Sequence, residues 1–257
     1  MVDHPPWRRA LRIAGAVVVV VVMAAAARDL AGGASAPNSV SSGRNPLTPS
    51  PSAPSGSRDP SAPLLAGLVV ADSDVAPALT VAGLQGGNGL TQPTLDLCNG
   101  TFPSEGMRTA RLQVAAVNGQ GETVLSTEAV LYSSGAGTTA AFNELRKVSA
   151  ACPSSPVDSP VGEPTVTTHF GPAPDAGWPQ VTSVERLAYS FDVTDTSGET
   201  THQVAVFLRR GRALLGVYFS RPDAPPSVQG RTTLPDIVNL FAARLAKLPV
   251  EAVSTTA

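Results

Sequence analysis

Few residues of this chain are suited to catalysis, since its 257 residues include only three His and two Cys. A zinc site would need both His169 and His202 plus a carboxylate, and no helical spacing joins these residues. The chain lacks a G-x-S-x-G motif, so a triad of His202 with Asp192 or Asp195 has no nucleophile on a sharp turn. The glycine-rich residues 85–89 lack the Lys-Ser/Thr ending of a P-loop. We therefore expect no metal, no cofactor and no enzymatic activity.

Lysine is nearly absent, because only Lys147 and Lys247 occur and Arg supplies the rest of the positive charge. Charged residues make up 15% of the chain, and the formal net charge is −2. From Leu64 onward, 12 basic and 17 acidic residues give a net charge of −5. Nucleic-acid-binding domains usually show a clustered basic face, so we expect no nucleic-acid partner.

Long apolar runs are also lacking, except near the N-terminus. Residues 1–12 form a basic tail with three Arg, and the 15 residues 13–27 that follow are apolar or small. A bilayer span needs about 20 residues, so an uncleaved anchor and a cleaved signal peptide both remain open for the segment 13–34. The basic flank predicts that the tail stays in the cytoplasm. We expect a single-pass cell-membrane protein with its C-terminal domain outside, or a secreted protein.

A Pro- and Ser-rich segment separates this N-terminal part from the rest. Residues 35–63 have almost no apolar side chains to bury, so we expect a disordered stalk that holds the following domain away from a membrane. We expect the folded domain over residues 64–249 and a disordered tail over residues 250–257.

The strongest periodic pattern lies in residues 183–220 and predicts three antiparallel strands. Apolar side chains alternate with others in residues 187–193 and in residues 203–209. Gly211 then suits a tight hairpin turn. Residues 213–219 are apolar on both faces, which predicts a central strand that is covered on both sides.

An earlier hairpin and two helices complete the predicted elements. Residues 107–117 and 123–133 read as paired strands, and residues 138–152 read as a helix with an apolar stripe. A C-terminal helix begins after the N-cap Thr233 and ends before Pro249. The short run 64–75 leaves helix and strand open, and the Pro- and Gly-rich residues 157–179 predict irregular structure. The fold class is therefore α+β, an antiparallel sheet with two packed helices, in which two hairpin–helix half repeats are conceivable.

Cys98 and Cys152 are the two cysteines, and an even number in an oxidising compartment predicts a disulfide. The bond would join the apolar stripe of the helix predicted over residues 138–152 to the loop before the first strand. Without a CxxC pair or a nearby His, a metal or redox role is not expected.

Two features are candidates for ligand binding. Arg209, Arg210 and Arg212 cluster at a predicted hairpin, where they would hold a phosphate or an anionic lipid headgroup, or simply form a solvated hairpin tip. Trp178 and Phe170 lie in the irregular region, where they would either plug the core or line a groove.

The apolar segment, the stalk and several local motifs together carry a family resemblance. These motifs are the Leu-rich start ending in Ala71-Asp72, Cys98, the helix with Ala140-Ala141-Phe142 ending at Cys152, and the long strand pair before a final helix. In these features the chain resembles the extracellular sensor-type domains of actinobacteria, found on transmembrane Ser/Thr kinases and in envelope proteins and lipoproteins. The resemblance implies an α+β fold with a groove for a ligand or partner, and it carries over no catalytic residue. The kinase-linked members have two disulfides where this chain can form one. With 12 residues before the apolar run, we expect no kinase domain in this chain.

The sequence thus favours a non-catalytic, membrane-tethered or secreted binding domain of the cell envelope. Its expected partners are the membrane, through the N-terminal segment, and a small molecule, a wall fragment or an envelope protein. A structural or assembly protein that acts through a protein partner remains open, and so does an envelope hydrolase.

Overall fold

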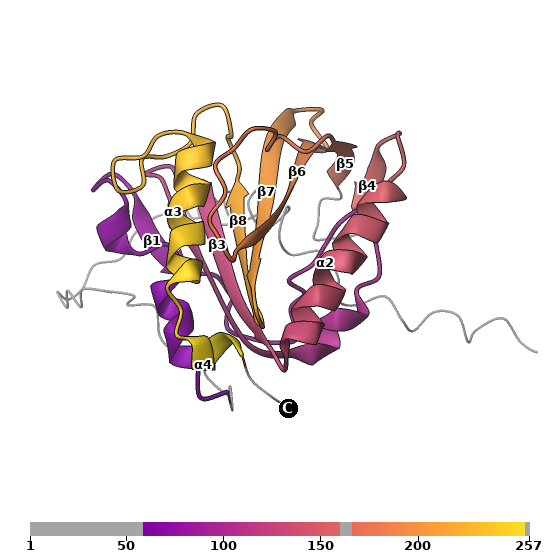
Figure 1. Cartoon of the computed structure of the whole chain (residues 1–257). Coiled ribbons are helices and arrows are strands. Elements are labelled where there is room, and N and C mark those ends of the chain that lie inside the picture. The colour runs from indigo at the N-terminus through magenta and orange to yellow at the C-terminus, as the bar shows by residue number, and fades with distance from the viewer. Residues whose placement is uncertain (1–58, 160–165, 255–257) are drawn as a thin grey trace, which may run out of the picture.

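One antiparallel sheet of eight strands organises residues 59–159 and 166–254, the residues that the computed structural model describes (Figure 1). The strand order is β1-β2-β3-β8-β7-β6-β5-β4. The strands are β1 (Thr80–Gly83), β2 (Arg108–Val117), β3 (Thr123–Tyr132), β4 (Val157–Ser159), β5 (Val166–Gly171), β6 (Glu185–Thr194), β7 (Thr200–Arg210) and β8 (Ala213–Phe219). The helices are α2 (Gly135–Ala150), α3 (Leu234–Ala246) and α4 (Val250–Val253), with the 3-10 helices η2 (Ala62–Gly67), η3 (Asp72–Asp74) and η4 (Pro103–Met107).

Strand β8 lies at the centre of the sheet, as its apolar sequence predicts, and separates two hydrophobic cores. On one face, which we call the α3 face, Leu215 and Phe219 belong to a core that includes Ile237 and Phe241 of α3 and Leu65 of η2. All five side chains are fully buried. Full burial of a large apolar side chain contributes roughly 1.5–3 kcal/mol, so this core fixes α3 and η2 against the sheet.

The opposite face, which we call the α2 face, carries the second core. Leu214 and Tyr218 of β8 alternate with the residues of the first core and pack with Phe142 and Leu145 of α2. An aromatic row continues from Tyr218 to Phe207, whose ring centroids are 5.9 Å apart. The two helices therefore cover opposite faces of one sheet (Figure 1).

The two hairpin–helix units share their order of elements but not their handedness. β2 and β3 lead into α2, and β7 and β8 lead into α3. β3 and β8 are antiparallel neighbours. The axis of a two-fold rotation that exchanges such neighbours is perpendicular to the sheet, so the rotation would leave both helices on the same face. Since α2 and α3 lie on opposite faces, this rotation does not superpose the units.

Several segments differ from the expectation from sequence. Residues 157–179 were expected to be irregular, but they contain β4 and β5, which extend the sheet beyond β6. The undecided run 64–75 contains parts of two short 3-10 helices, η2 and η3, joined by irregular residues. The expected disordered tail begins with α4, in which Ala252 and Val253 are buried.

The expected tail, apolar segment and most of the stalk, residues 1–58, lie outside the described residues. Packing begins before the predicted domain start, because Asp59 is paired with Arg212 and Ala62 is buried. Within residues 59–159 and 166–254, no helix is both long and apolar enough to cross a membrane.

Candidate functional site

A long irregular loop between β1 and β2 covers part of the α2 face. It runs from residue 84 to residue 102 before the short helix η4 begins. Loops of this length without regular structure are uncommon in compact domains and often carry function. The contacts beneath this loop show how it is held.

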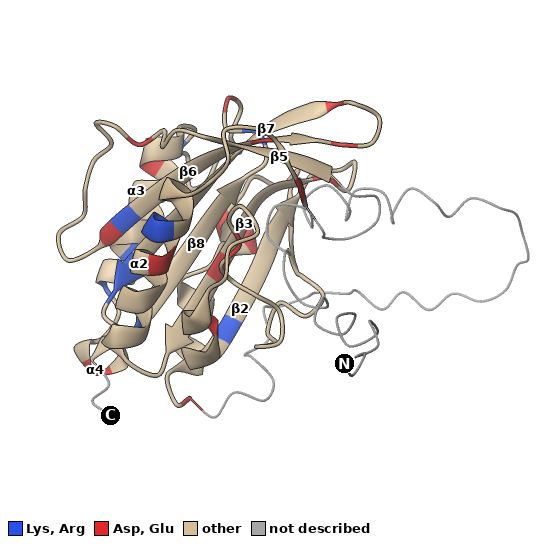
Figure 2. Cartoon of the chain, turned by 90° about the vertical axis from the view of Figure 1, so that its right-hand side faces the viewer, with Lys and Arg blue, Asp and Glu red and all other residues tan. Residues whose placement is uncertain are grey.

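A buried ion pair on β2 and β3 holds the start of the loop. Arg111 and Glu128 are fully buried, and Nε of Arg111 donates to Oε1 of Glu128 at 2.5 Å. The same guanidinium donates to the carbonyl oxygen of Gly86 in the loop at 2.9 Å and to Oε1 of Gln113 at 2.6 Å. Figure 2 shows charged positions along β2 and β3, where the pair lies. A buried ion pair needs such additional hydrogen bonds to offset its desolvation.

The Glu128 carboxylate also accepts hydrogen bonds from the loop and from the central strand β8. The hydroxyl of Thr94 donates to Glu128 at 2.7 Å, and the hydroxyl of Tyr218 donates at 3.2 Å. Burial, together with the nearby Glu128 carboxylate, raises the pKa of Tyr218 well above its ordinary value. Tyr218 therefore stays neutral and remains a hydrogen-bond donor to the carboxylate.

Arg108 and Glu105 hold the middle of the loop. Arg108 donates to the carbonyl oxygens of Leu90 and Gln92, each at 2.7 Å. Glu105 accepts from the backbone N–H groups of Thr94 at 2.8 Å and Leu95 at 3.1 Å. Burial raises the pKa of Glu105 to about 6, while Arg108 and these N–H groups oppose the shift. The two charged side chains thus replace the backbone pairing that the loop lacks.

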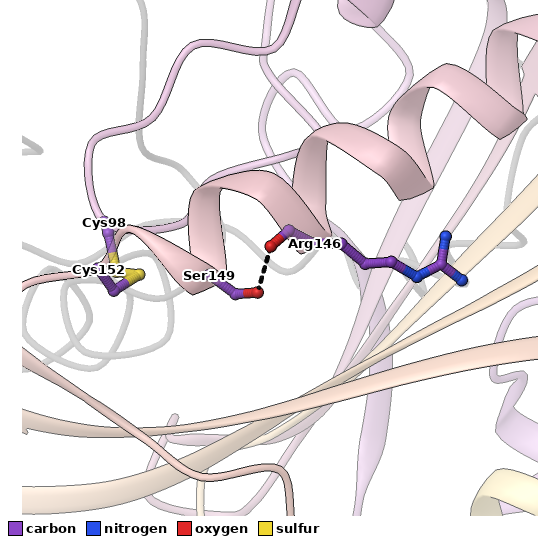
Figure 3. Close-up of a disulfide and its surroundings, with 4 residues drawn as sticks. All are labelled: Cys98, Arg146, Ser149 and Cys152. Carbon is purple, nitrogen blue, oxygen red and sulfur yellow. Dashed lines mark hydrogen bonds between the residues drawn. A yellow bond between two sulfur atoms is a disulfide. The ribbon is translucent and has the colours of Figure 1, made fainter.

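The predicted disulfide fixes the end of the loop to helix α2 (Figure 3). The Cα atoms of Cys98 and Cys152 are 5.6 Å apart, within the ordinary range for such a bond. Cys98 and the next residue, Asn99, have φ of 49° and 55°, in the left-handed region. At Gly100 an added Cβ would lie 2.6 Å from Cγ1 of Val148 on α2, so only glycine fits there. The loop therefore has one shape imposed by charge, disulfide and close packing.

One hollow opens on the outer side of this loop, with a volume of about 340 Å³. Glu105 and Arg108 form its charged part, but hydrogen bonds within the domain already occupy the guanidinium and most of the carboxylate. This hollow therefore has few free polar groups with which to orient a ligand. It is lined by Thr91, Pro93, Leu95, Gly100, Thr101, Phe102, Glu105 and Arg108.

A second, smaller pocket lies beside the disulfide, and we call it the Asp96 pocket. Its volume is about 30 Å³, enough for one or two water-sized groups. Burial raises the pKa of Asp96 to about 6. Among the described residues no hydrogen bond or ion pair reaches this carboxyl group, which is partly buried. The pocket is lined by Asp96, Leu97, Cys98, Asn99, Pro153, Ser155, Val157, Thr168, Phe170 and Phe191.

The three arginines of the predicted anion site point to different places. Arg209 pairs with Glu185 and lies over the ring of Phe142 at 5.3 Å, on the α2 face. Arg210 donates to two carbonyl oxygens at the end of α3, on the opposite face. Arg212 is buried, where it pairs with Asp59. Their described contacts are thus internal and do not form one shared surface cluster.

The two aromatic residues predicted to plug the core or line a groove lie on opposite faces of the sheet. Trp178 packs against the α3-face core, and the guanidinium of Arg186 lies 5.6 Å from its ring. Phe170 lies on the α2 face and lines the Asp96 pocket. Trp178 is thus partly buried at the edge of the α3-face core, whereas Phe170 forms part of a pocket wall.

The structure brings His169, Asp192 and His202 together on neighbouring strands. His202 Nδ1 lies 2.9 Å from Oδ1 of Asp192, and His169 Nδ1 lies 3.7 Å from Oδ2 of the same carboxylate. These residues face one another across β5, β6 and β7 and are well exposed. No group of three or more His, Cys, Asp or Glu within the described ranges is arranged to hold a metal ion.

The sequence reading did not identify Asp96 or the charges beneath the loop. One local signal existed, since Asp96 is a lone acid between Leu95 and Leu97, two positions before Cys98. An acidic side chain between two apolar residues becomes poorly solvated once the disulfide at Cys98 holds that segment against the domain. No local pattern pairs Arg111 with the loop, because Arg111 and Gly86 lie 25 positions apart.

Comparisons with known proteins give weak structural likenesses and no match in sequence. No protein-family model matches the chain, and no curated protein matches its sequence. The extracellular domain of PknH from Mycobacterium tuberculosis is similar in structure, with a TM-score of 0.41 and 12% identity over 70% of this chain and 92% of that chain. An uncharacterized protein from Mycobacterium smegmatis, an Rv0999 ortholog, has a TM-score of 0.34 and 13% identity over 66% of this chain and 89% of that chain.

The likeness to the PknH extracellular domain matches the sensor-type resemblance expected from the sequence. At these TM-scores and identities it carries no argument about what this chain does. What this chain binds must follow from its own residues.

Proposed function

We propose that this chain is a non-catalytic binding domain outside the cytoplasm, and that its ligand enters the Asp96 pocket. The observation that carries the proposal is a carboxyl group without a partner among the described residues, held in a pocket by a preorganised loop. Ionisable groups with shifted pKa values in pockets are frequent at functional sites. The disulfide at the pocket edge supports an oxidising, extracytoplasmic location.

The residues that line the pocket support a binding function over hydrolysis. General acid–base catalysis usually needs a second ionisable group or an activated nucleophile near the first. Among the described residues that line this pocket, Asp96 is the one with an ionisable side chain. A rigid loop also favours binding, because less conformational entropy is lost when a ligand arrives.

A thermal-shift screen of the full chain, with its disulfide formed, tests the proposal. Wall fragments, lipids, nucleotides and amines would be added in turn, because a ligand of the folded state raises Tm. The variant Ser155→Trp places a large side chain at the exposed rim of the pocket. The matched control Ser254→Trp changes an exposed residue after α4.

We expect at least one class to raise Tm in the wild type and in Ser254→Trp but not in Ser155→Trp. If a ligand stabilises all three proteins equally, its site lies elsewhere and the pocket assignment is wrong. If no class shifts Tm, a structural role through a protein partner gains support.

A further inference from the structure

We propose that the Asp96 pocket binds the terminal ammonium group of an organic amine, whose remaining part extends out of the pocket. The inference rests on the proposed function, because it names the chemical class of ligand for the same site. It is carried by a contrast among the carboxylates, by the pocket wall and by the pocket size.

Asp96 differs from the other carboxylates that lie inside the described domain. Glu128 pairs with Arg111, Asp74 pairs with Arg244 at 2.6 Å, and Asp59 pairs with Arg212. Glu105 pairs with Arg108, and Glu144 accepts hydrogen bonds from the N–H and hydroxyl of Ser104. Asp96 receives no cation and no donor from any described residue. A poorly solvated carboxyl group of this kind gains most from a ligand that brings a positive charge.

The pocket wall suits the rest of an alkylammonium ion. Phe170 and Phe191 lie with ring centroids 5.9 Å apart in an edge-to-face arrangement, and both line the pocket. Aromatic faces attract cations, and they also pack against alkyl chains. Thr168 and Ser155 at the same pocket offer hydroxyl oxygens that can accept the remaining ammonium hydrogens.

Other ligand classes fit the pocket less well. An anion would meet the carboxylate of Asp96 without a compensating cation, because no described lining residue is basic. A metal ion would find a single carboxylate and no His among those residues. The net charge of −5 from Leu64 onward also favours the approach of cations over anions.

The pocket size indicates how much of the ligand enters. A volume of about 30 Å³ accommodates a headgroup the size of one or two waters, not a whole metabolite. The recognised part is therefore a terminal –NH₃⁺ group with its first carbons. A lysine side chain, a free N-terminus or a diamine presents such a group.

The experiment is an NMR titration of the full chain, disulfide intact, with three small probes of matched length. These probes are n-butylammonium, n-butanol and butyrate, added at pH 7.5. The readouts are the side-chain carboxyl carbon of Asp96 and the backbone amides of Asn99 and Thr168. We expect n-butylammonium to shift all three signals with a Kd at least tenfold lower than that of n-butanol, and butyrate to leave them unchanged.

Two variants isolate the charge of the pocket. Asp96→Asn keeps the shape but removes the carboxylate, and we expect it to weaken n-butylammonium at least tenfold. Asp223→Asn removes an equal charge from an exposed position and should leave the Kd unchanged. If Asp96→Asn folds poorly, the wild type at pH 4.5 serves instead, because its protonated Asp96 should also bind at least tenfold more weakly.

Each contrary result is decisive. Equal binding of n-butanol and n-butylammonium, or unchanged binding in Asp96→Asn, would overturn the ammonium assignment and leave the pocket as a site for neutral ligands. An absence of shifts with n-butylammonium at 100 mM would also overturn it. The thermal-shift screen tests the binding function separately, so the two failures can be told apart.

Discussion

At the scale of single residues, this domain pairs its buried charges and leaves one exposed to a pocket. Arg111, Arg108 and Arg212 each neutralise a carboxylate and also donate to backbone carbonyls. Asp96 has no such partner among the described residues. Because its ionised form is poorly solvated in the folded state, Asp96 should lower the free energy of unfolding at neutral pH, and this loss can be measured.

We expect Asp96→Asn to stabilise the protein at neutral pH but not in acid. Burial raises the pKa of Asp96 from 3.8 to about 6, so the folded state binds more protons than the unfolded state between these values. Stability therefore falls as pH rises through this window, and Asn removes the effect. Since the group is partly exposed, we expect a gain of about 1–2 kcal/mol at pH 7.5 and almost none at pH 4. Urea unfolding at both pH values measures it, and a gain that is equal at both would contradict the assignment.

We expect Arg111→Met to destabilise the domain strongly. The change leaves the fully buried Glu128 carboxylate without its cation, and breaking such a pair costs about 3–5 kcal/mol. Urea unfolding of Arg111→Met measures the loss. The matched control is Arg221→Met, which breaks the exposed pair with Glu122 and should cost less than about 1 kcal/mol. Similar losses for the two variants would mean that the buried pair does not support the loop.

At the scale of elements, the loop between β1 and β2 is held by three separate attachments. Arg111 holds Gly86 near its start, Arg108 holds Leu90 and Gln92, and the disulfide holds Cys98 at its end. Each attachment joins the loop to a different part of the α2 face. The loss of one should therefore loosen its own part of the loop first.

We expect the double variant Cys98→Ser with Cys152→Ser to lose stability and to loosen the Asp96 pocket. The bond closes a chain segment with a sequence separation of 54, for which the chain-entropy estimate is roughly 4 kcal/mol. Hydrogen exchange should rise over residues 96–100 more than over residues 86–92, which Arg111 and Arg108 still hold. Equal exchange in both parts would show that the loop moves as one unit.

At this scale, the sequence predicted those elements whose pattern lies within their own residues, and it missed those that depend on distant partners. Strands β6, β7 and β8 were predicted because alternation and the turn at Gly211 are contained in their own residues. Strands β4 and β5 were not predicted, because they are short, and β5 is held by its pairing with β6. The disulfide was predicted because only two cysteines exist, whereas the covering of Arg111 by the loop depends on distant residues.

At the scale of the whole molecule, the two ends of the described domain both contact the guanidinium of Arg212. Asp59 lies at its start, and its carboxylate accepts from Arg212 beside β8, at 2.5 Å for the closer contact. Arg212 also donates to the carbonyl oxygen of Ala252 in α4 at 2.8 Å. Composition alone placed Asp59 in the stalk, because its partner lies 153 positions away. This single guanidinium thus ties the entry of the chain, the sheet and the last helix together.

We expect Asp59→Asn to destabilise the protein at pH 7 and to have little effect near pH 2. Burial alone would raise the pKa of Asp59, but hydrogen bonds from Arg212, Thr109 and the Ser61 N–H outweigh it and lower the pKa to about 2. The pair therefore contributes stability above the unfolded pKa of 3.8, and this stability is lost as pH falls toward 2. A loss of about 1–2 kcal/mol at pH 7 is expected from urea unfolding. Asp223→Asn, which changes an exposed aspartate, is the control. If Asp59→Asn costs no more than this control, the pair with Arg212 does not stabilise the start of the described domain.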